Sequence, residues 1–353
     1  MKLLILLSLF FLVPGLFVTR KAAAASRPRI FVLATGGTIA GRADTPTALT
    51  AYQAGTLRIE SLLATVPPLR DIANVTGETI CDIDSKDMTE EIWLRLARRV
   101  NELFAEESAD GVVITHGTDT LEETAYFLNL TVKSDRPVVL TGAMRPATSL
   151  SADGPLNLLD AVRTAASPDA AGKGVLIVMN GEINAARDVA KTNTLALDAF
   201  QSPDMGLLGY VNDGIPTFYR QTRRYHTAQS EFDVTRLASL PPVKILYGHA
   251  ADDALFVEAA VRAGVRGLVY AGLGNGSIPQ SVETALTEAA ARGVIVVRAS
   301  RTGSGAVVPE RSPAGSPFLS AGTLSPQKAR ILLQLALTRT ANRSEIQRMF
   351  LEY

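Results

Sequence analysis

Short uninterrupted apolar runs alternate with amphipathic stretches along most of the chain. The runs are rich in Val and Ile and lack polar alternation, which predicts strands buried on both faces, at residues 29–34, 111–115, 137–141 and 174–179. Apolar side chains on one helical stripe, with charges opposite, predict helices between them, at residues 88–103, 121–130 and 153–165. This alternation predicts an α/β fold with a mostly parallel sheet.

The pattern changes between residues 212 and 242, where glycine and proline are frequent and apolar periodicity is weak, as in a connection between domains. The alternation then restarts, with strands expected at 243–247, 267–271 and 293–299 and helices at 253–263, 280–291 and 326–337. We therefore expect a larger amino-terminal parallel-sheet domain of flavodoxin-like type and a smaller carboxy-terminal α/β domain. Their expected limits are residues 26–218 and 243–353, with a linker at 219–242.

The amino terminus has the pattern of a secretory signal. A basic start at Lys2 precedes an apolar run over residues 3–18, and four alanines at 22–25 provide a small-residue exit. Cleavage after Ala25 would send the mature chain to the periplasm or the outside of the cell. The alternative is an uncleaved membrane anchor, but the run is short for a span and is interrupted by Pro14 and Gly15.

Composition and charge exclude several classes of protein. The 353 residues are 47% hydrophobic and 20% charged, which fits a compact globular protein and not a disordered one. Without residues 1–25 the chain carries 32 basic and 35 acidic side chains, which gives no electrostatic reason to expect nucleic acid or an anionic membrane as partner. The single cysteine, Cys81, excludes an intrachain disulfide, and the three histidines lie far apart without metal-ligand spacing.

Candidate chemistry lies in loops that directly follow two predicted strands. Residues 35–41 read TGGTIAG after the first strand, and residues 116–120 read HGTDT after the second. Ligands of open parallel sheets bind beyond the carboxyl ends of the strands, and glycines let a ligand or an oxyanion approach peptide N–H groups there. The first loop alone suits nucleotide binding and acyl chemistry equally, although it lacks the spacing and lysine of a phosphate loop. The second also suits a helix N-cap.

Three more side chains could share that edge of the sheet. Lys191 follows the fourth predicted strand and could act as a proton acceptor if it lies beside Thr118. Ser85 follows a strand-like run at residues 78–83, and Tyr52 lies in a loop downstream of Thr38. Each also has an ordinary structural explanation: Lys191 as a solvated surface lysine, Ser85 as a turn residue and Tyr52 as a packed surface aromatic. Because no G-x-S-x-G elbow is present and histidines are few, threonine activated by lysine or tyrosine remains the best nucleophile.

With these motifs together, residues 30–353 resemble the bacterial type II, or exported, L-asparaginases and glutaminase-asparaginases. The most specific matches are ATGGTIA at 34–40 and GVVITHGTDT at 111–120, supported by GAMRP at 142–146, SADGP at 151–155, KTN at 191–193 and GNGS at 274–277. The resemblance implies hydrolysis of L-asparagine to L-aspartate and ammonia through a threonine acyl-enzyme, with secondary L-glutaminase activity. It also implies a homotetramer, a dimer of dimers, that needs no metal or cofactor.

The resemblance also implies roles for individual residues. Thr38 is the nucleophile, and Tyr52, on a mobile loop, helps to activate it. Thr118 holds water for Lys191 as base, with Asp119 in the same cluster. The remaining residues bind the substrate. The N–H groups of Gly37 and Thr118 bind the oxyanion, with Gly117 in the same loop, and Ser85 and Asp119 bind the α-carboxylate and α-ammonium groups. The Ala143 carbonyl accepts from the leaving nitrogen, and Ser277 and Glu310 reach the site from a neighbouring subunit.

Two positions depart from the family pattern. Lys86 stands where the family usually has Gln or Glu beside the α-ammonium, and it would repel that group unless it turns outward. Ser277 stands where asparagine-selective members often have Asn, and Ser occurs in members that also hydrolyse glutamine. Two other classes of function remain open. One is an exported binding protein for an amino acid or anion that uses the same loops without chemistry, and a weaker one is a nucleotide-binding oxidoreductase built on the glycines of residues 272–276.

Overall fold

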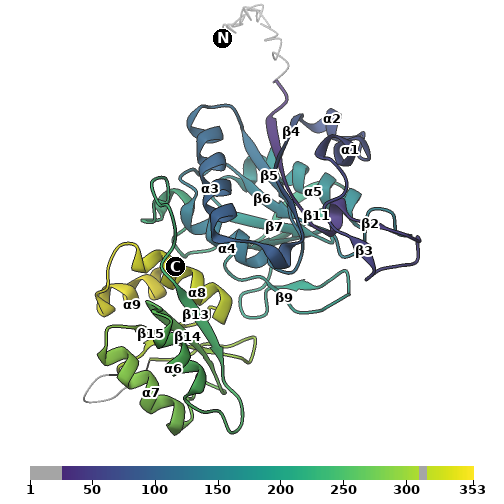
Figure 1. Cartoon of the computed structure of the whole chain (residues 1–353). Helices are drawn as coiled ribbons and strands as arrows, with labels where there is room; N and C mark the ends of the chain where they lie inside the picture. Colours follow the sequence, from purple (N-terminus) through teal and green to yellow (C-terminus); the bar gives the residue numbers. More distant parts are fainter. Residues whose placement is uncertain (1–25, 310–315) are drawn as a thin grey trace, which may run out of the picture.

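The computed structural model describes residues 26–309 and 316–353 (Figure 1). Its main sheet has eight strands in the order β12-β11-β8-β7-β6-β5-β1-β4. Five of them are parallel neighbours: β4 (Asn74–Ile83), β1 (Arg29–Gly36), β5 (Gly111–Thr115), β6 (Val138–Thr141) and β7 (Val175–Met179). Taken in chain order, these five follow the flavodoxin-like arrangement, in which the strand order reverses between β1 and β5.

An antiparallel extension completes the sheet beyond β7. It consists of β8 (Glu182–Ala185), β11 (Gly209–Asn212) and β12 (Ile215–Phe218). The β11–β12 hairpin turns at Asp213 and Gly214, both at positive φ, and ends at Phe218, just before the expected linker. It lies at the start of the stretch of weak apolar periodicity, because a four-residue strand that is half exposed leaves little of that pattern.

Helices cover both faces of the main sheet. One face carries α3 (Glu90–Ala105) and α4 (Leu121–Thr131), and the other carries α5 (Gly154–Ala166) with the short α1 (Ile59–Ala64) and α2 (Leu69–Ile72). The start of α3 is fixed by Thr89, whose hydroxyl accepts from the N–H of Ile92, and by two acidic side chains in its first turn. The central parallel strands β5, β6 and β7 are accordingly buried along their whole length.

The shorter elements of the larger domain and of the connecting segment lie mostly in loops. They are the helical turns η1 (Thr38–Ala40), η2 (Ser85–Asp87), η3 (Pro168–Ala170) and η4 (Thr227–Gln229), and two antiparallel pairs, β2 (Arg42–Ala43) with β3 (Tyr52–Gln53) and β9 (Ala190–Lys191) with β10 (Phe200–Gln201). Two-residue strands carry no usable sequence period, so none of these pairs was predicted. Both pairs nevertheless carry candidate site residues, Tyr52 and Lys191.

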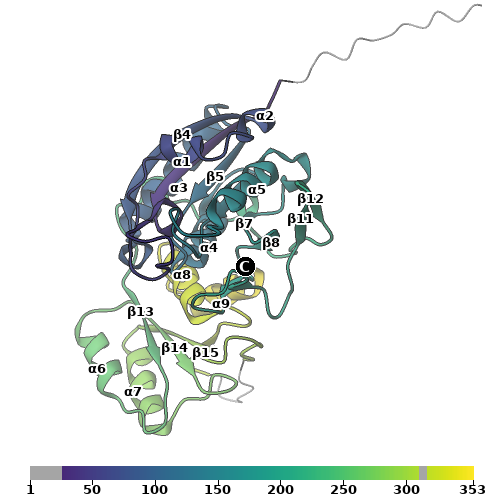
Figure 2. The ribbon, with the colours of Figure 1, turned by 90° about the vertical axis from the view of Figure 1, so that its right-hand side faces the viewer.

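The smaller domain is a second parallel sheet, ordered β13 (Val243–Tyr247), β14 (Gly267–Gly272), β15 (Ile295–Ser300) and β16 (Leu319–Ser320). One face carries α6 (Leu255–Arg262) and α7 (Gln280–Ala291), and the other carries α8 (Pro326–Leu337), against which α9 (Arg343–Glu352) packs. Figure 2 shows α8 between this sheet and α4 of the larger domain. The expected fold class is thereby confirmed, although α9 was not predicted.

The two domains share one apolar core. A single cluster of buried side chains includes Leu96 and Phe127 on the larger domain and Val269 and Leu332 on the smaller one. It is continuous because α8 packs against both α4 and the second sheet. Among the described residues, no helix is both long and apolar enough to cross a membrane.

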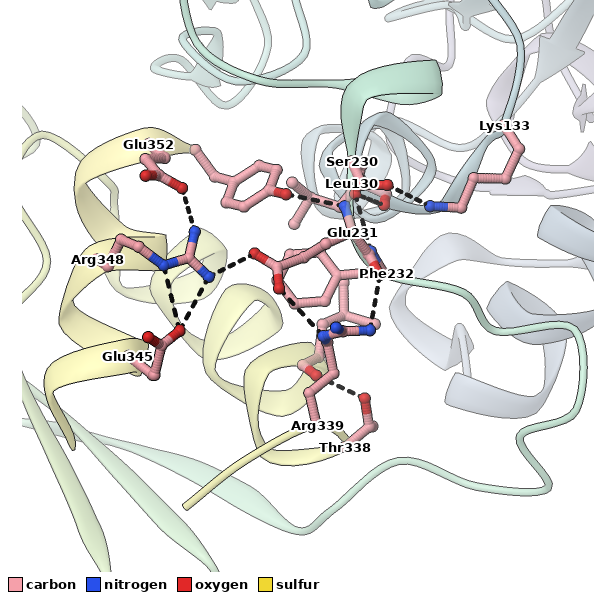
Figure 3. A network of polar contacts seen from close by, with 12 residues as sticks. Leu130, Lys133, Ser230, Glu231, Phe232, Thr338, Arg339, Glu345, Arg348 and Glu352 are labelled. Atoms are coloured by element: carbon pink, nitrogen blue, oxygen red, sulfur yellow. Dashed lines mark hydrogen bonds and ion pairs between the residues drawn. The ribbon is translucent and has the colours of Figure 1, made fainter. Parts of the chain in front are cut away.

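The segment between the domains is bonded to both of them (Figure 3). The carboxylate of Glu231 accepts from Arg348 of α9 at 2.9 Å and from Arg339, just beyond α8, at 3.1 Å. One residue earlier, the carbonyl of Ser230 accepts from Lys133 of the larger domain at 2.6 Å. These contacts fix the path of the connecting segment on the surface of both domains.

Candidate active site

The candidate residues gather where the strand order of the main sheet reverses. Ser85 follows β4, Thr38 follows β1 and Thr118 follows β5, and these three strands are adjacent and parallel. Parallel strands end at the same edge, so the three loops meet there. The prediction that both Gly-Thr loops share one edge of the sheet is confirmed.

Glycine allows these loops to touch backbone to backbone. Gly37 has φ 82°, and a Cβ atom there would lie 2.3 Å from the Cα and N of Gly117. A Cβ atom on Gly117 would lie 2.6 Å from the hydroxyl oxygen of Ser85. Any larger residue at either position would force apart the segments that carry Thr38, Thr118 and Ser85.

Thr38 is paired with Tyr52. The two hydroxyl oxygens lie 2.6 Å apart, and Thr38 is only 6% exposed. Tyr52 reaches this position because β3 pairs with β2, which follows the helical turn that begins at Thr38. One hydroxyl can therefore pass its proton to, or receive one from, the other.

Lys191 lies against the second loop. Its amine donates to the hydroxyl of Thr118 at 2.9 Å and to the carboxylate of Asp119 at 2.6 Å. The side chain of Lys191 is 17% exposed, whereas that of Asp119 is 59% exposed. The structure thus brings together the hydroxyl, amine and carboxylate that the sequence predicted as one cluster, with the carboxylate open to an incoming ligand.

Ser85 is buried beneath this cluster. Its hydroxyl oxygen accepts from the N–H of Asp119 at 3.2 Å, and its carbonyl accepts from the hydroxyl of Thr120 at 2.8 Å. Within the described part of the chain no acceptor takes the hydroxyl hydrogen of Ser85, so this hydrogen could be donated to an anion.

Lys86 is held by its neighbour Asp84. The amine of Lys86 lies 2.5 Å from the Asp84 carboxylate and is largely exposed. Burial pushes the pKa of Asp84 upward, but hydrogen bonds and the charge of Lys86 outweigh it and keep this pKa below its usual value. The positive charge that the sequence placed beside a substrate ammonium is therefore paired within the chain.

The backbone N–H groups of the two loops differ. The N–H of Gly37 donates to the carbonyl of Ile83 at 3.0 Å, so it is not free to hold an oxyanion in this structure. This corrects the expectation drawn for Gly37, whose evident role is the close contact with Gly117. The N–H of Thr118 makes no hydrogen bond to the described part of the chain. Ala143, fully buried, follows Gly142, where a Cβ atom would lie 2.7 Å from the His116 carbonyl.

Two candidates lie elsewhere. Ser277 closes a tight turn of the smaller domain, where it exchanges backbone hydrogen bonds with Leu273. Within residues 26–309 and 316–353, no hydrogen bond joins Ser277 to the other site residues. Glu310 lies outside the described residues.

A buried hydrogen-bond chain that the sequence did not reveal supports the second loop. The indole N–H of Trp93 donates to Thr124, which bonds the Nε2 atom of His116, and Nδ1 of His116 bonds the carbonyl of Gly117 at 2.7 Å. An indole only donates and a carbonyl only accepts, so Thr124 donates to His116 and Nδ1 carries the hydrogen. Burial lowers the pKa of His116 to about 4, which keeps the ring neutral.

Glu122 was also missed. Its carboxylate accepts from the backbone N–H of Lys191 at 2.7 Å. The only sequence signal was an acidic residue in the first turn of a predicted helix, which has an ordinary explanation in the helix dipole. In the described ranges, no group of three His, Cys, Asp or Glu side chains is arranged to hold a metal ion.

Comparisons with known proteins show which proteins this chain resembles. Residues 29–224 match the family model described as "Asparaginase, N-terminal", and residues 242–350 match "Glutaminase/Asparaginase C-terminal domain". The chain is 50% identical to "L-asparaginase 2" of Escherichia coli over 333 residues, covering 94% of this chain and 95% of that protein. It is 48% identical to "Probable L-asparaginase periplasmic" of Haemophilus influenzae over 334 residues, covering 94% and 95%.

A solved structure extends the likeness to the whole fold. The crystal structure titled as a probable cytoplasmic L-asparaginase from Campylobacter jejuni superposes with a TM-score of 0.90 and 50% sequence identity, over 93% of this chain and 100% of that one. The chain belongs to the asparaginase family.

Proposed function

We propose that this protein hydrolyses L-asparagine to L-aspartate and ammonia and that it also accepts L-glutamine. Membership of the asparaginase family and the names of its relatives support this proposal. The glutaminase part is supported by the family description that matches the smaller domain. The observation that carries most weight is the pair of activated hydroxyls, Thr38 beside Tyr52 and Thr118 beside Lys191, at one edge of the sheet.

In the proposed first step, Thr38 attacks the side-chain amide carbon. Tyr52 removes the hydroxyl proton as the new C–O bond forms, and the proton goes to the departing nitrogen, which leaves as ammonia when the C–N bond breaks. The N–H of Thr118, which makes no hydrogen bond within the described residues, would be one backbone donor for the oxyanion, and one such donor contributes about 3 kcal/mol. The Ala143 carbonyl would accept from the leaving nitrogen.

In the second step, water attacks the ester carbon of acylated Thr38. Thr118 positions the water, and Lys191 takes one of its protons through or beside the Thr118 hydroxyl as the new C–O bond forms. The ester C–O bond to Thr38 then breaks, L-aspartate leaves, and that proton is passed on to the Thr38 oxygen, beside which the Tyr52 hydroxyl lies at 2.6 Å. The α-ammonium of the substrate would bind Asp119 and compete with Lys191 for that carboxylate. Ser85 would donate its unused hydrogen to the α-carboxylate.

Ammonia release tests the proposal directly. Purified protein is incubated with L-asparagine, L-glutamine or D-asparagine at near-neutral pH, and ammonia and the product acid are both quantified. We expect equal amounts of ammonia and L-aspartate, and slower release from L-glutamine. A protein that leaves both L-amides intact contradicts the proposal and favours an amino acid-binding protein on the same loops.

We also propose a homotetramer in which Ser277 reaches the site of a neighbouring subunit. Support comes from the exposed position of Ser277 in the smaller domain, where it makes no hydrogen bond to the rest of the site in the described part of the same chain. Light scattering coupled to size exclusion measures the assembly. Mixed oligomers of Thr38→Ala and Ser277→Trp chains should regain activity, since some sites then combine two intact halves; no recovery contradicts sharing.

We propose that the two domains span residues 26–218 and 243–353. We also propose that the leader at residues 1–25 directs export. The Haemophilus relative is named periplasmic, whereas the Campylobacter structure is titled cytoplasmic, so the leader carries this part of the proposal. Amino-terminal sequencing of the protein recovered outside the cytoplasm should begin at Ser26. A mature chain that begins at Met1 contradicts cleavage.

A further inference from the structure

The first turn of α8 reaches the catalytic segment of the larger domain. Glu122 is 5% exposed, and its two carboxylate oxygens have different partners. One accepts from the backbone N–H of Lys191 at 2.7 Å, and the other accepts from the side-chain amide of Gln327 on α8 at 2.6 Å. A single carboxylate therefore joins the smaller domain to the backbone of Lys191.

The next residue of α8 binds the same segment from its other end. Lys328 is 2% exposed, and its amine donates to the carbonyl of Arg187 at 3.0 Å and to the carbonyl of Val189. Together with Glu122, it bonds three backbone atoms within the five residues that end at Lys191. Within the described residues, the two-residue strand β9 pairs only with β10, so these side-chain contacts add to few backbone bonds.

The placement of Lys328 has an energetic cost. A cation in the first turn of a helix opposes the helix dipole, and burial lowers the pKa of Lys328 to about 8 although Glu122 and Asp188 counter the effect. A buried charge pair is weak support for stability, because apolar side chains of similar volume often replace one without loss. A geometric role explains better why these polar groups converge on one strand.

We propose that Glu122 and Lys328 are positioning residues, which hold the backbone of Lys191 so that its amine reaches Thr118. This inference rests on the proposed role of Lys191 in hydrolysis. It makes α8 of the smaller domain a part of the catalytic apparatus of the larger domain in the same chain. The alternative is that both residues serve only the attachment of one domain to the other.

The main test compares Lys328→Met with a matched control on the same helix. Arg330→Met removes another contact between α8 and the larger domain, the 2.8 Å bond from Arg330 to Glu90, but leaves residues 187–191 untouched. We expect Lys328→Met to lower kcat for L-asparagine about 10- to 100-fold, with KM changed less than about threefold, because misplacement of a catalytic group affects the chemical step. Arg330→Met should keep kcat even where its melting temperature falls equally.

Variants at Glu122 separate hydrogen bonding from charge and remain informative if Lys328→Met fails to fold. Glu122→Gln can keep both hydrogen bonds, since the Gln327 amide can rotate to offer its oxygen. It should retain most of the kcat that Glu122→Ala loses. Equal losses in these two variants, or equal kcat values in Lys328→Met and Arg330→Met, would overturn the proposal.

Crystal structures supply a readout that does not depend on turnover. In Lys328→Met and Glu122→Ala, the amine of Lys191 should move beyond hydrogen-bond distance of Thr118, from the 2.9 Å of the parent. An unmoved amine overturns the positioning role. If instead Lys191 moves while kcat is unchanged, or Lys191→Ala itself remains active, the role of Lys191 in the proposed hydrolysis fails and the geometric contact stands.

Discussion

The hydroxyl oxygens of Thr38 and Tyr52 lie 2.6 Å apart, although Thr38 directly follows the main sheet and Tyr52 comes from a separate two-stranded ribbon. The ribbon contributes no other candidate residue. A tyrosine on a strand of only two residues can leave and return to its partner without disturbing the main sheet, which suits a group that must let substrate in and then close over it.

Removal of the nucleophile should abolish turnover. Thr38→Ala is expected to lower kcat at least about 10³-fold, because no other hydroxyl occupies its place. Thr38→Ser, which keeps the hydroxyl, is the control and should retain measurable turnover. Mass spectrometry of rapidly quenched parent enzyme should find the acyl adduct on the peptide that contains Thr38; an adduct on another residue contradicts the assignment.

Loss of the Tyr52 hydroxyl should slow the chemical step. Tyr52→Phe keeps the ring but removes the proton acceptor, and we expect kcat to fall about 10²- to 10⁴-fold. Tyr219→Phe removes the hydroxyl of a tyrosine that is 66% exposed and should have no effect. Steady-state kinetics on L-asparagine measure both; parent-like kcat in Tyr52→Phe would mean that Thr38 is activated by another group.

The contact between the two Gly-Thr loops should tolerate no side chain. Gly37→Ala forces a Cβ atom into the backbone of Gly117, so we expect loss of activity together with a fall in melting temperature. Gly172 also has positive φ, but a Cβ atom there meets nothing within 4 Å. Gly172→Ala therefore isolates backbone strain, about 1 kcal/mol, and should leave kcat unchanged. Similar behaviour of the two variants would refute the clash.

His116 should make stability fall at acidic pH. Its pKa in the folded protein is about 4, below the ordinary 6.5, so between these values the unfolded chain binds more protons. The free energy of unfolding should thus rise with pH across this interval, by up to about 3 kcal/mol from this residue, and be lost as pH falls.

Chemical denaturation at a series of pH values tests this expectation. His116→Gln should show a shallower slope than the parent between these pH values, whatever its absolute stability. His249→Gln replaces an exposed histidine and should retain most of the parental slope. Parallel curves for the parent and His116→Gln would show that His116 does not titrate differently on folding.

The strands and the position of the site could be predicted because both follow from local patterns. Buried parallel strands are continuous apolar runs, and the rule that ligands bind where strand order reverses places the loops after β1 and β5 together. Lys191 was a candidate because it follows a predicted strand, but its contact with Thr118 depends on a two-residue strand that no period reveals.

Other features depend on contacts between distant parts of the chain. Glu122 and Lys328 both contact the segment that ends at Lys191, but they come from helices far apart in the sequence. Glu122 and its partner Gln327, the neighbour of Lys328, are 205 residues apart. Whether a backbone N–H group is free to bind a ligand likewise depends on the neighbouring strand. The carbonyl of Ile83 in β4 accepts from the N–H of Gly37, whereas no described residue accepts from the N–H of Thr118. Neither fact is encoded in the Gly-Thr motifs themselves.

The apolar cluster that passes without interruption from α4 through α8 into the second sheet makes the two lobes one thermodynamic unit. Either lobe produced alone would expose a large apolar surface to water and would tend to aggregate. Calorimetry of the intact polypeptide should accordingly record one endotherm. Heat inactivation should occur over the same temperature range, because the lobe that carries the active site cannot stay folded when the other unfolds.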